Sequence, residues 1–295
     1  MRPAGFIRTA FRTLGRRVRP QGLILLYHRI AIVDADPWQL CVSPEHFEEH
    51  LTVLRKFRPG RLTEMTGSMP RGSIAVTFDD GYADNLHGAA RLLQKHEIPA
   101  TFFLTSGYLG GHAEFWWDEL ERRMSDTGPA WLPAYYKLYD VLQPLADKER
   151  RQMLAEIGGP ESAGSARESH RVLNMDEVSE LAAMALVEIG AHTVTHPRLS
   201  AQTAQDQLTE MRESKQFLEA AVGQNIDTFS YPFGGCGHYS PESVEMAREA
   251  GFAVACTTTP GVVDRTSSRF ELPRVVIEDM DGDRFERLLN EYLTN

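Results

Sequence analysis

Short apolar runs alternate with amphipathic stretches along most of the chain. The clearest run, residues 74–78, is apolar or β-branched throughout and ends at two adjacent acids, Asp79 and Asp80. A run of this length and composition predicts a buried strand. Six further runs predict strands at residues 22–28, 99–105, 187–192, 226–231, 251–256 and 272–277.

Helical patterns separate these runs. Phe47, Leu51 and Leu54 recur at helical spacing, and Ser43 followed by Pro44 is typical of a helix start. Comparable patterns predict helices near residues 85–96, 175–186, 201–222, 241–250 and 284–293. Strands that alternate with helices form parallel sheets. The seven runs therefore predict an α/β fold, an open sheet or a barrel, and their number favours a deformed (β/α)7-type barrel.

One stretch interrupts the alternation. Residues 107–172 have a mostly helical pattern and are rich in Trp and Tyr. We expect a helical insertion between two strands at about 107–172, within a barrel domain that covers residues 21–295. Its aromatic side chains should form mainly a local core, with one or two of them stacking on a ligand as the alternative.

The N-terminal segment differs in charge from the rest of the chain. The formal net charge is −10, which argues against general nucleic-acid binding. Residues 1–20 nevertheless contain six Arg and no acid, with Phe6, Ile7, Phe11 and Leu14 between them. Two alternatives fit this segment: an amphipathic helix on an anionic membrane surface, or a disordered basic tail.

Cysteine usage and hydropathy bear on the compartment. The three cysteines, Cys41, Cys236 and Cys256, are odd in number and lack metal-site spacing, which suits a reducing compartment. No stretch approaches the ~20 apolar residues of a membrane span, and the N-terminus makes a poor secretory signal. We therefore expect a cytoplasmic protein, with peripheral contact to the cytoplasmic membrane through residues 1–20 under the first alternative.

Polar residues gather where the predicted strands end. Because the carboxyl ends of parallel strands meet at one rim, these side chains should lie close together. Among these residues the case for Arg274 is the weakest, since it lies near the start of its predicted strand and not at its end. The set comprises His28, Asp79, Asp80, His192, His196, the run Tyr231-Pro-Phe-Gly-Gly and Arg274.

Two histidines four residues apart, opposite an Asp pair, predict a metal site. Imidazole and carboxylate ligands suit zinc or a similar divalent ion. His192, His196 and one Asp give three protein ligands and leave a position for water, as in catalytic sites. The other Asp is then free to act as general base. Taken alone, the Asp-Asp-Gly sequence is more typical of a turn with both acids in water.

At this point the chain resembles the polysaccharide deacetylases, carbohydrate esterase family 4 with its chitooligosaccharide deacetylase homology domain. The resemblance rests on Thr77-Phe-Asp-Asp-Gly81 and His192-Thr-Val-Thr-His196, with weaker support from Phe229-Ser-Tyr-Pro-Phe-Gly234. It implies that Asp79 is the general base and that Asp80, His192 and His196 hold the metal. It also implies a deformed (β/α) barrel.

The chain departs from the family pattern in two places. Many members have an Arg-x-Pro-Tyr motif, whose Arg orients the catalytic Asp and whose last residue gives a backbone N–H to the oxyanion. Here the motif reads Ser230-Tyr-Pro-Phe233, so the backbone donor of Phe233 remains while Arg274 becomes the candidate for the lost Arg. A late Leu-x-His motif, the source of the general acid, is missing. His28, His238 and His112 are the candidates in that order, and proton return by Asp79 is the simpler alternative.

These observations together predict a hydrolase that depends on a divalent metal ion, which we expect to be Zn2+. The resemblance implies that it removes an N-acetyl group from an amino sugar of a cell-surface polysaccharide or its lipid-linked precursor. The alternatives are a deformylase or O-deacetylase acting on a related sugar, an amidase acting on a non-sugar, and a non-catalytic carbohydrate-binding protein.

Overall fold

The computed structural model describes residues 22–66, 70–110, 113–125, 130–157 and 166–294. The basic segment 1–20 and His112 lie outside the described residues, so the predictions made for them stay predictions. In the described part of the chain, no helix is both long and apolar enough to span a membrane.

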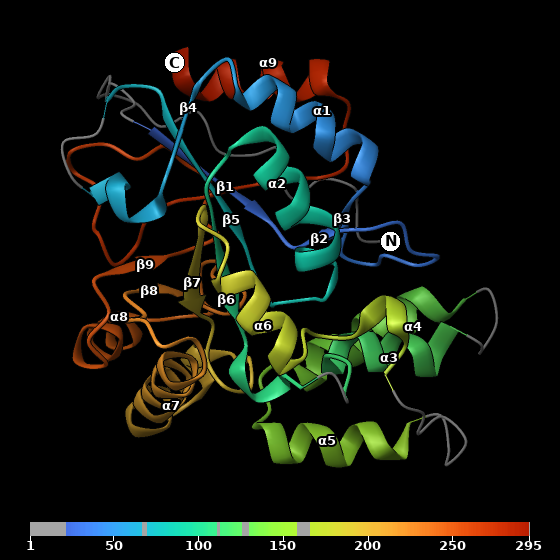
Figure 1. Cartoon of the computed structure of the whole chain (residues 1–295). Coiled ribbons are helices and arrows are strands. Elements are labelled where there is room, and N and C mark those ends of the chain that lie inside the picture. The colour runs from blue at the N-terminus through green and yellow to red at the C-terminus, as the bar shows by residue number, and fades with distance from the viewer. Residues whose placement is uncertain (1–21, 67–69, 111–112, 126–129, 158–165, 295) are drawn as a thin grey trace, which may run out of the picture.

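Seven parallel strands form the path of the main sheet, in the order β10-β1-β5-β6-β7-β8-β9 (Figure 1). Six lie within runs that predicted a strand, and β5 matches the seventh run but begins one residue earlier, at Ser73. The strands are β1 (Gly22–Tyr27), β5 (Ser73–Phe78), β6 (Ala100–Leu104), β7 (Val187–Ala191), β8 (Thr228–Ser230), β9 (Val254–Cys256) and β10 (Val275–Val276).

Three short strands have no counterpart among the predicted runs. Strand β4 (Arg58–Gly60) pairs with the first half of β5, whereas β6 pairs with the second half. Strands β2 (Arg29–Ile30) and β3 (Cys41–Val42) form a separate parallel pair. Because β4 and β6 share one edge of β5, the sheet departs from a regular barrel at this point.

The sheet curls into an incomplete barrel, as predicted. Leu272, just before β10, forms a parallel bridge with Cys256 at the end of β9, so the two ends of the strand path approach each other. Ile24, Phe103 and Val254 come from separate strands but belong to one buried cluster with Leu272. This cluster fills the inside of the curl, while a larger one packs between the sheet and its helices.

Helices follow most strands and cover the outer face of the sheet (Figure 1). Helix α1 begins as predicted, since Ser43 accepts a hydrogen bond from the His46 N–H and Pro44 occupies the first position. A π-helical turn at Asn85–Ala90 leads into α2. The covering helices are α1 (Pro44–Leu54), α2 (Arg91–His96), α6 (Met175–Ala182), α7 (Ala204–Val222), α8 (Pro241–Glu249) and α9 (Gly282–Thr294).

Between β6 and α6 the chain forms three further helices, α3 (Trp116–Ser125), α4 (Trp131–Leu142) and α5 (Asp147–Glu156). They gather at one side of the barrel (Figure 1). Trp116, Tyr135 and Tyr139 are buried there in a cluster of their own, which also includes Tyr82 of the barrel. The helical character of this stretch and its aromatic core agree with the prediction.

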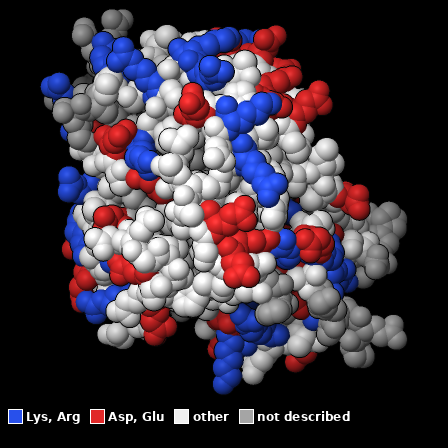
Figure 2. Space-filling view, viewed as in Figure 1, with Lys and Arg blue, Asp and Glu red and all other residues white. Residues whose placement is uncertain are grey.

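Acidic and basic side chains are interspersed over the face of the molecule shown in Figure 2. Such mixing is typical of a solvated protein surface. The groups with candidate chemistry are instead buried: the exposed fractions of Asp79, Asp80, His192 and His196 are 2, 3, 1 and 4 %.

Candidate active site

A left-handed turn brings the two acids to one rim. Asp79 follows β5, and its N–H donates to the Tyr27 carbonyl at 3.0 Å as a continuation of the strand pairing. Asp80 has φ 79° and Gly81 has φ 94°. Successive strand residues point to opposite faces, so this change of backbone conformation is what places both carboxylates at the same rim. Asp tolerates left-handed φ better than most residues.

Asp79 is paired with an internal cation. Arg274 Nη1 donates to Asp79 Oδ1 at 2.7 Å, and Arg274 Nη2 donates to Asp79 Oδ2 at 2.6 Å. Ser230 Oγ adds a hydrogen bond to Asp79 Oδ2 at 3.0 Å. The two-pronged pair fixes both the position and the plane of the carboxylate.

Every donor of the Arg274 guanidinium is used. Nε donates to the Thr257 carbonyl at 2.9 Å, and Nη1 also donates to Thr77 Oγ1 at 3.1 Å. Nη2 also donates to Ser230 Oγ at 2.7 Å. With the two bonds to Asp79, these account for the five N–H donors of an arginine. Arg274 therefore reaches the rim although it precedes its strand, because the long side chain spans the barrel interior.

This pairing sets the charge of Asp79. Burial acts to raise the pKa of its carboxyl group, but the charges of Arg274 and His192 act in the other direction. The net result lowers the pKa of Asp79 to about 2. Asp79 is thus an oriented, ionised carboxylate at neutral pH.

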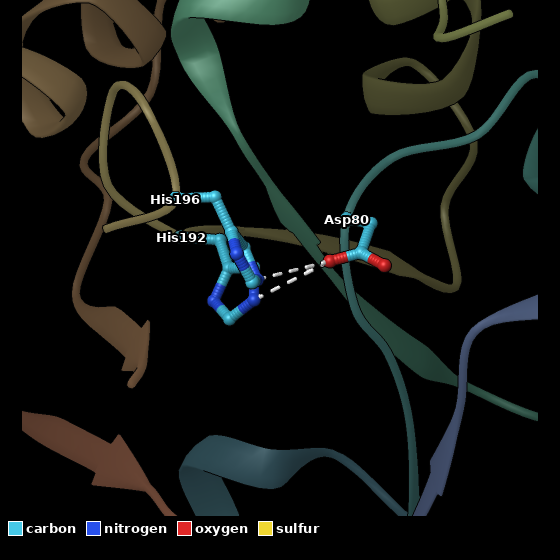
Figure 3. Close-up of side chains that lie close together, drawn as sticks. All are labelled: Asp80, His192 and His196. Carbon is cyan, nitrogen blue, oxygen red and sulfur yellow. Dashed lines mark ion pairs between the residues drawn. The ribbon is translucent and has the colours of Figure 1, made fainter. Parts of the chain in front are cut away.

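Asp80 faces the two histidines instead (Figure 3). The Nε2 atoms of His192 and His196 each lie 3.5 Å from Asp80 Oδ1. Candidate ligand atoms of the three residues all lie within 4.8 Å of one another. Three of the predicted site residues are thereby brought together as a compact, buried donor set.

The donor set fits a divalent metal ion. Ligands about 2.1 Å from a tetrahedral ion lie about 3.4 Å apart, close to the two nitrogen–oxygen separations observed. His192 Nδ1 donates to the Ser230 carbonyl at 2.7 Å, which directs the other ring nitrogen, Nε2, toward Asp80. Burial acts to lower the pKa of His192, yet Asp79 and Asp80 raise it overall. The carboxylates therefore favour positive charge at this position.

Phe233 presents a free backbone donor at the same rim. Its φ is 60°, and its carbonyl accepts a hydrogen bond from Thr258 Oγ1 at 2.7 Å. None of the backbone or side-chain hydrogen bonds between described residues uses the Phe233 N–H. The Phe233 ring lies 4.6 Å from the His196 ring, so this residue borders the donor set.

The three candidates for the general acid differ in where they lie relative to the site. His28 follows β1, is half-buried, and lies close enough to Asp79 and His196 to affect the pKa of both. The His238 ring packs on the Phe233 ring, with ring centres 5.4 Å apart. Its Nε2 lies 3.4 Å from Gln143 Nε2. His112 lies outside the described residues. Of the two that are described, His28 is the one whose charge acts on the base.

The insertion contributes to the site through α3. Trp117 packs on His196 with ring centres 4.8 Å apart, and its Nε1 donates to the Tyr82 hydroxyl at 2.9 Å. Tyr82 in turn donates to Asp118 at 2.7 Å and lies under the Arg29 guanidinium. The aromatic insertion is thus tied to the turn that carries Asp79 and Asp80.

Sequence reasoning missed two residues that touch the site, Ser230 and Trp117. Ser230 occupies the place where many related motifs have Arg, and that departure was the available signal. Trp117 belongs to the aromatic run of the insertion, from which the sequence could not single out one side chain.

Comparison with known proteins agrees with this geometry. A model of the polysaccharide deacetylase family matches residues 66–255. A putative polysaccharide deacetylase, YxkH of Bacillus subtilis, is 24% identical over 271 residues, which cover 89% of this chain and 74% of the relative. A Staphylococcus aureus poly-β-1,6-N-acetyl-D-glucosamine N-deacetylase is 20% identical over 85% of this chain and 71% of the relative.

Solved structures share the fold. IcaB from Ammonifex degensii has a TM-score of 0.65 at 18% identity, with 93% of this chain and 97% of that chain covered. The Streptococcus pyogenes deacetylase PplD, solved with acetate, has a TM-score of 0.63 at 20% identity, with 90% and 97% covered. The family match spans more than half of the chain and contains the Asp pair and both histidines. The chain therefore belongs to the polysaccharide deacetylase family.

Proposed function

We propose that this protein is a metal-dependent hydrolase that removes an N-acetyl group from an amino sugar. The proposed substrate is a cell-surface polysaccharide or its lipid-linked precursor. The observation that carries the proposal is the contrast within one rim: an ionised, Arg-paired Asp79 beside a compact set of Asp80, His192 and His196. A base next to a set of metal-ligating side chains suits hydrolysis by activated water.

The metal role rests on the fit of the three ligands. When bound there, a divalent ion, Zn2+ in this proposal, supplies Lewis acidity that polarises a carbonyl oxygen and lowers the pKa of water. Asp80, His192 and His196 would hold it, and His192 is oriented for this by its bond to the Ser230 carbonyl.

The remaining residues have distinct roles. Asp79 accepts the proton of the attacking water, and Arg274 keeps that carboxylate ionised and oriented. The Phe233 N–H donates to the oxygen that becomes negative in the tetrahedral intermediate. The departing amine then takes a proton from His28, the described candidate acid whose charge acts on Asp79, or from Asp79 itself.

The sugar specificity is supported by the curated relatives. The Staphylococcus aureus relatives are named as poly-β-1,6-N-acetyl-D-glucosamine N-deacetylases, and their match covers most of this chain. An N-acetylated glucosamine is therefore the first substrate class to test.

We also propose that the protein is cytoplasmic and that residues 1–20 bring it to the cytoplasmic membrane surface, near a lipid-linked substrate. Six Arg interleaved with four large apolar residues support this proposal.

The test is a screen of acylated amino sugars, free and carrier-linked, with the Zn2+-loaded full-length protein and mass spectrometry of the products. Loss of an acetyl group from nitrogen supports the proposal. Loss of a formyl group, or loss of acetyl from oxygen, identifies one of the alternative hydrolases. Sugar binding without any mass change across the screen would leave a carbohydrate-binding protein.

A further inference from the structure

The backbone between the two metal-ligand histidines is unusual. Thr193 has φ 66° and His196 has φ 53°, both in the left-handed region, which a β-branched residue such as Thr193 seldom adopts. Within the segment, the His196 N–H donates to Thr193 Oγ1 at 3.1 Å. Such residues persist only where the surroundings hold them in place, so other contacts must fix this loop.

Glu210 supplies three of those contacts from α7. Its Oε2 accepts hydrogen bonds from the consecutive N–H groups of Val194 and Thr195, both at 2.8 Å. Its Oε1 accepts a hydrogen bond from Thr195 Oγ1 at 2.6 Å. Burial raises the pKa of the Glu210 carboxyl group, and these three hydrogen bonds act to lower it because they favour the ionised form. In Figure 1, α7 lies near the arrowhead of β7, just before the loop.

The opposite side of the loop is held by the segment after β6. The Ser106 N–H donates to the Thr193 carbonyl at 3.1 Å, and the Gly107 N–H donates to the Val194 carbonyl at 2.9 Å. A side chain at Gly107 would bring its Cβ within 2.5 Å of that carbonyl oxygen. The loop is therefore held on one side by the backbone of Ser106 and Gly107 and on the other side by the Glu210 carboxylate.

The two histidines differ in how their rings are held. His192 Nδ1 donates to the Ser230 carbonyl at 2.7 Å, which fixes its ring directly. His196 Nδ1 is buried and has no hydrogen-bond partner among the described residues. Metal-ligating histidines normally donate from their second nitrogen to a fixed acceptor. The position of the His196 ring thus depends on its backbone and on the aromatic rings packed around it.

We propose that Glu210 is the positioning residue for His196 and thereby sets the affinity of the Asp80–His192–His196 set for its metal. This inference rests on the proposed metal site. Glu210 touches neither the ligands nor the reacting atoms; it acts by holding the Val194–Thr195 backbone. Loss of such an outer partner typically weakens metal binding about 10–100-fold.

The test compares Zn2+ affinity of the full chain in wild type, Glu210→Ala, Glu210→Gln and Glu213→Ala by competition with a chromophoric chelator. Glu213 is an exposed acid on the same helix with no hydrogen bond among the described residues, so it is the matched control. We expect Glu210→Ala to bind Zn2+ about 10–100-fold more weakly and Glu213→Ala to bind as wild type does. Glu210→Gln should be intermediate, because its side-chain carbonyl still accepts from both N–H groups.

A second readout separates positioning from general stability. Histidine ring NMR of the metal-free protein should show a shifted His196 and an unchanged His192 in the Glu210 variants. Equal Zn2+ affinity of folded Glu210→Ala and wild type overturns the inference and leaves the proposed function intact. If Glu210→Ala does not fold, equal affinity of Glu210→Gln and wild type together with an unshifted His196 overturns it. If the wild-type protein binds no Zn2+, both this inference and the proposed metal-dependent function are overturned.

Discussion

Asp79 and Asp80 are neighbours in sequence, but they lie in opposite electrostatic surroundings. Asp79 faces Arg274, whose guanidinium binds both carboxylate oxygens at 2.7 and 2.6 Å. Asp80 faces His192 and His196, and among the described residues no Lys or Arg forms an ion pair with it. One acid thus has a permanent cation from the protein, whereas the other faces two imidazole rings.

The difference shows how two adjacent acids can share a rim and have separate roles. Two nearby carboxylates repel each other unless positive charge relieves them. Arg274 neutralises the Asp79 side, so the Asp80 side is the place left for an external cation. The chain departs from the family's usual Arg motif at Ser230, yet a guanidinium from a distant part of the sequence pairs with Asp79.

The largest expected effect comes from the Asp80 side. His192→Ala removes a metal ligand, so the variant should lose its divalent ion and its turnover should fall by more than about 100-fold, the upper end for changes in outer-shell partners. Metal analysis of the dialysed protein, together with product formation, checks this. A variant with full metal content and full turnover would remove His192 from the ligand set.

The Asp79 side can be broken by Arg274→Gln. Removing one partner of a buried ion pair costs about 3–5 kcal/mol in unfolding free energy, because the other charge is left uncompensated. Urea unfolding of the metal-free protein measures it, and Arg265→Gln, at an exposed position, is the control. Arg274→Lys should recover only part of the loss, since Lys lacks the two-pronged geometry. Wild-type stability and turnover in Arg274→Gln would show that Asp79 does not depend on this pair.

His28 sharpens the comparison. It lies near Asp79, but it is part neither of the Asp79–Arg274 ion pair nor of the Asp80–His192–His196 set. If it is the general acid, His28→Gln should lower turnover by about 100-fold and alter the high-pH limb of the pH–rate profile, with metal content unchanged. His238→Gln is the parallel variant. Normal turnover with an unaltered high-pH limb in His28→Gln would instead favour proton return by Asp79.

The smallest expected effect on chemistry concerns residues 1–20. Each basic residue near an anionic membrane surface contributes about 1 kcal/mol. Deleting this segment should weaken co-sedimentation with anionic vesicles and leave turnover of a soluble substrate unchanged. Vesicle binding that does not change on deletion would indicate a solvated tail.

The sequence predicted more of the fold than of the site's connections. Apolar runs located all seven strands of the main path, because burial on both faces selects continuous hydrophobic residues. The sharing of the β5 edge by β4 and β6 was not predictable, since Arg58–Gly60 has no strand character. The rim residues followed from strand ends. Ser230, Trp117 and Glu210 did not, because their roles depend on contacts between segments far apart in the chain.

The account's central claim is the division of labour between Asp79 and Asp80. The most direct measurement is the metal content and turnover of Asp79→Asn and Asp80→Asn, prepared side by side. Asp79→Asn should retain about one divalent ion per chain and lose turnover by about 100- to 10,000-fold, since an amide cannot accept the proton of water. Asp80→Asn should lose the ion. If Asp79→Asn released the metal while Asp80→Asn kept it, the two roles would be reversed and the account contradicted.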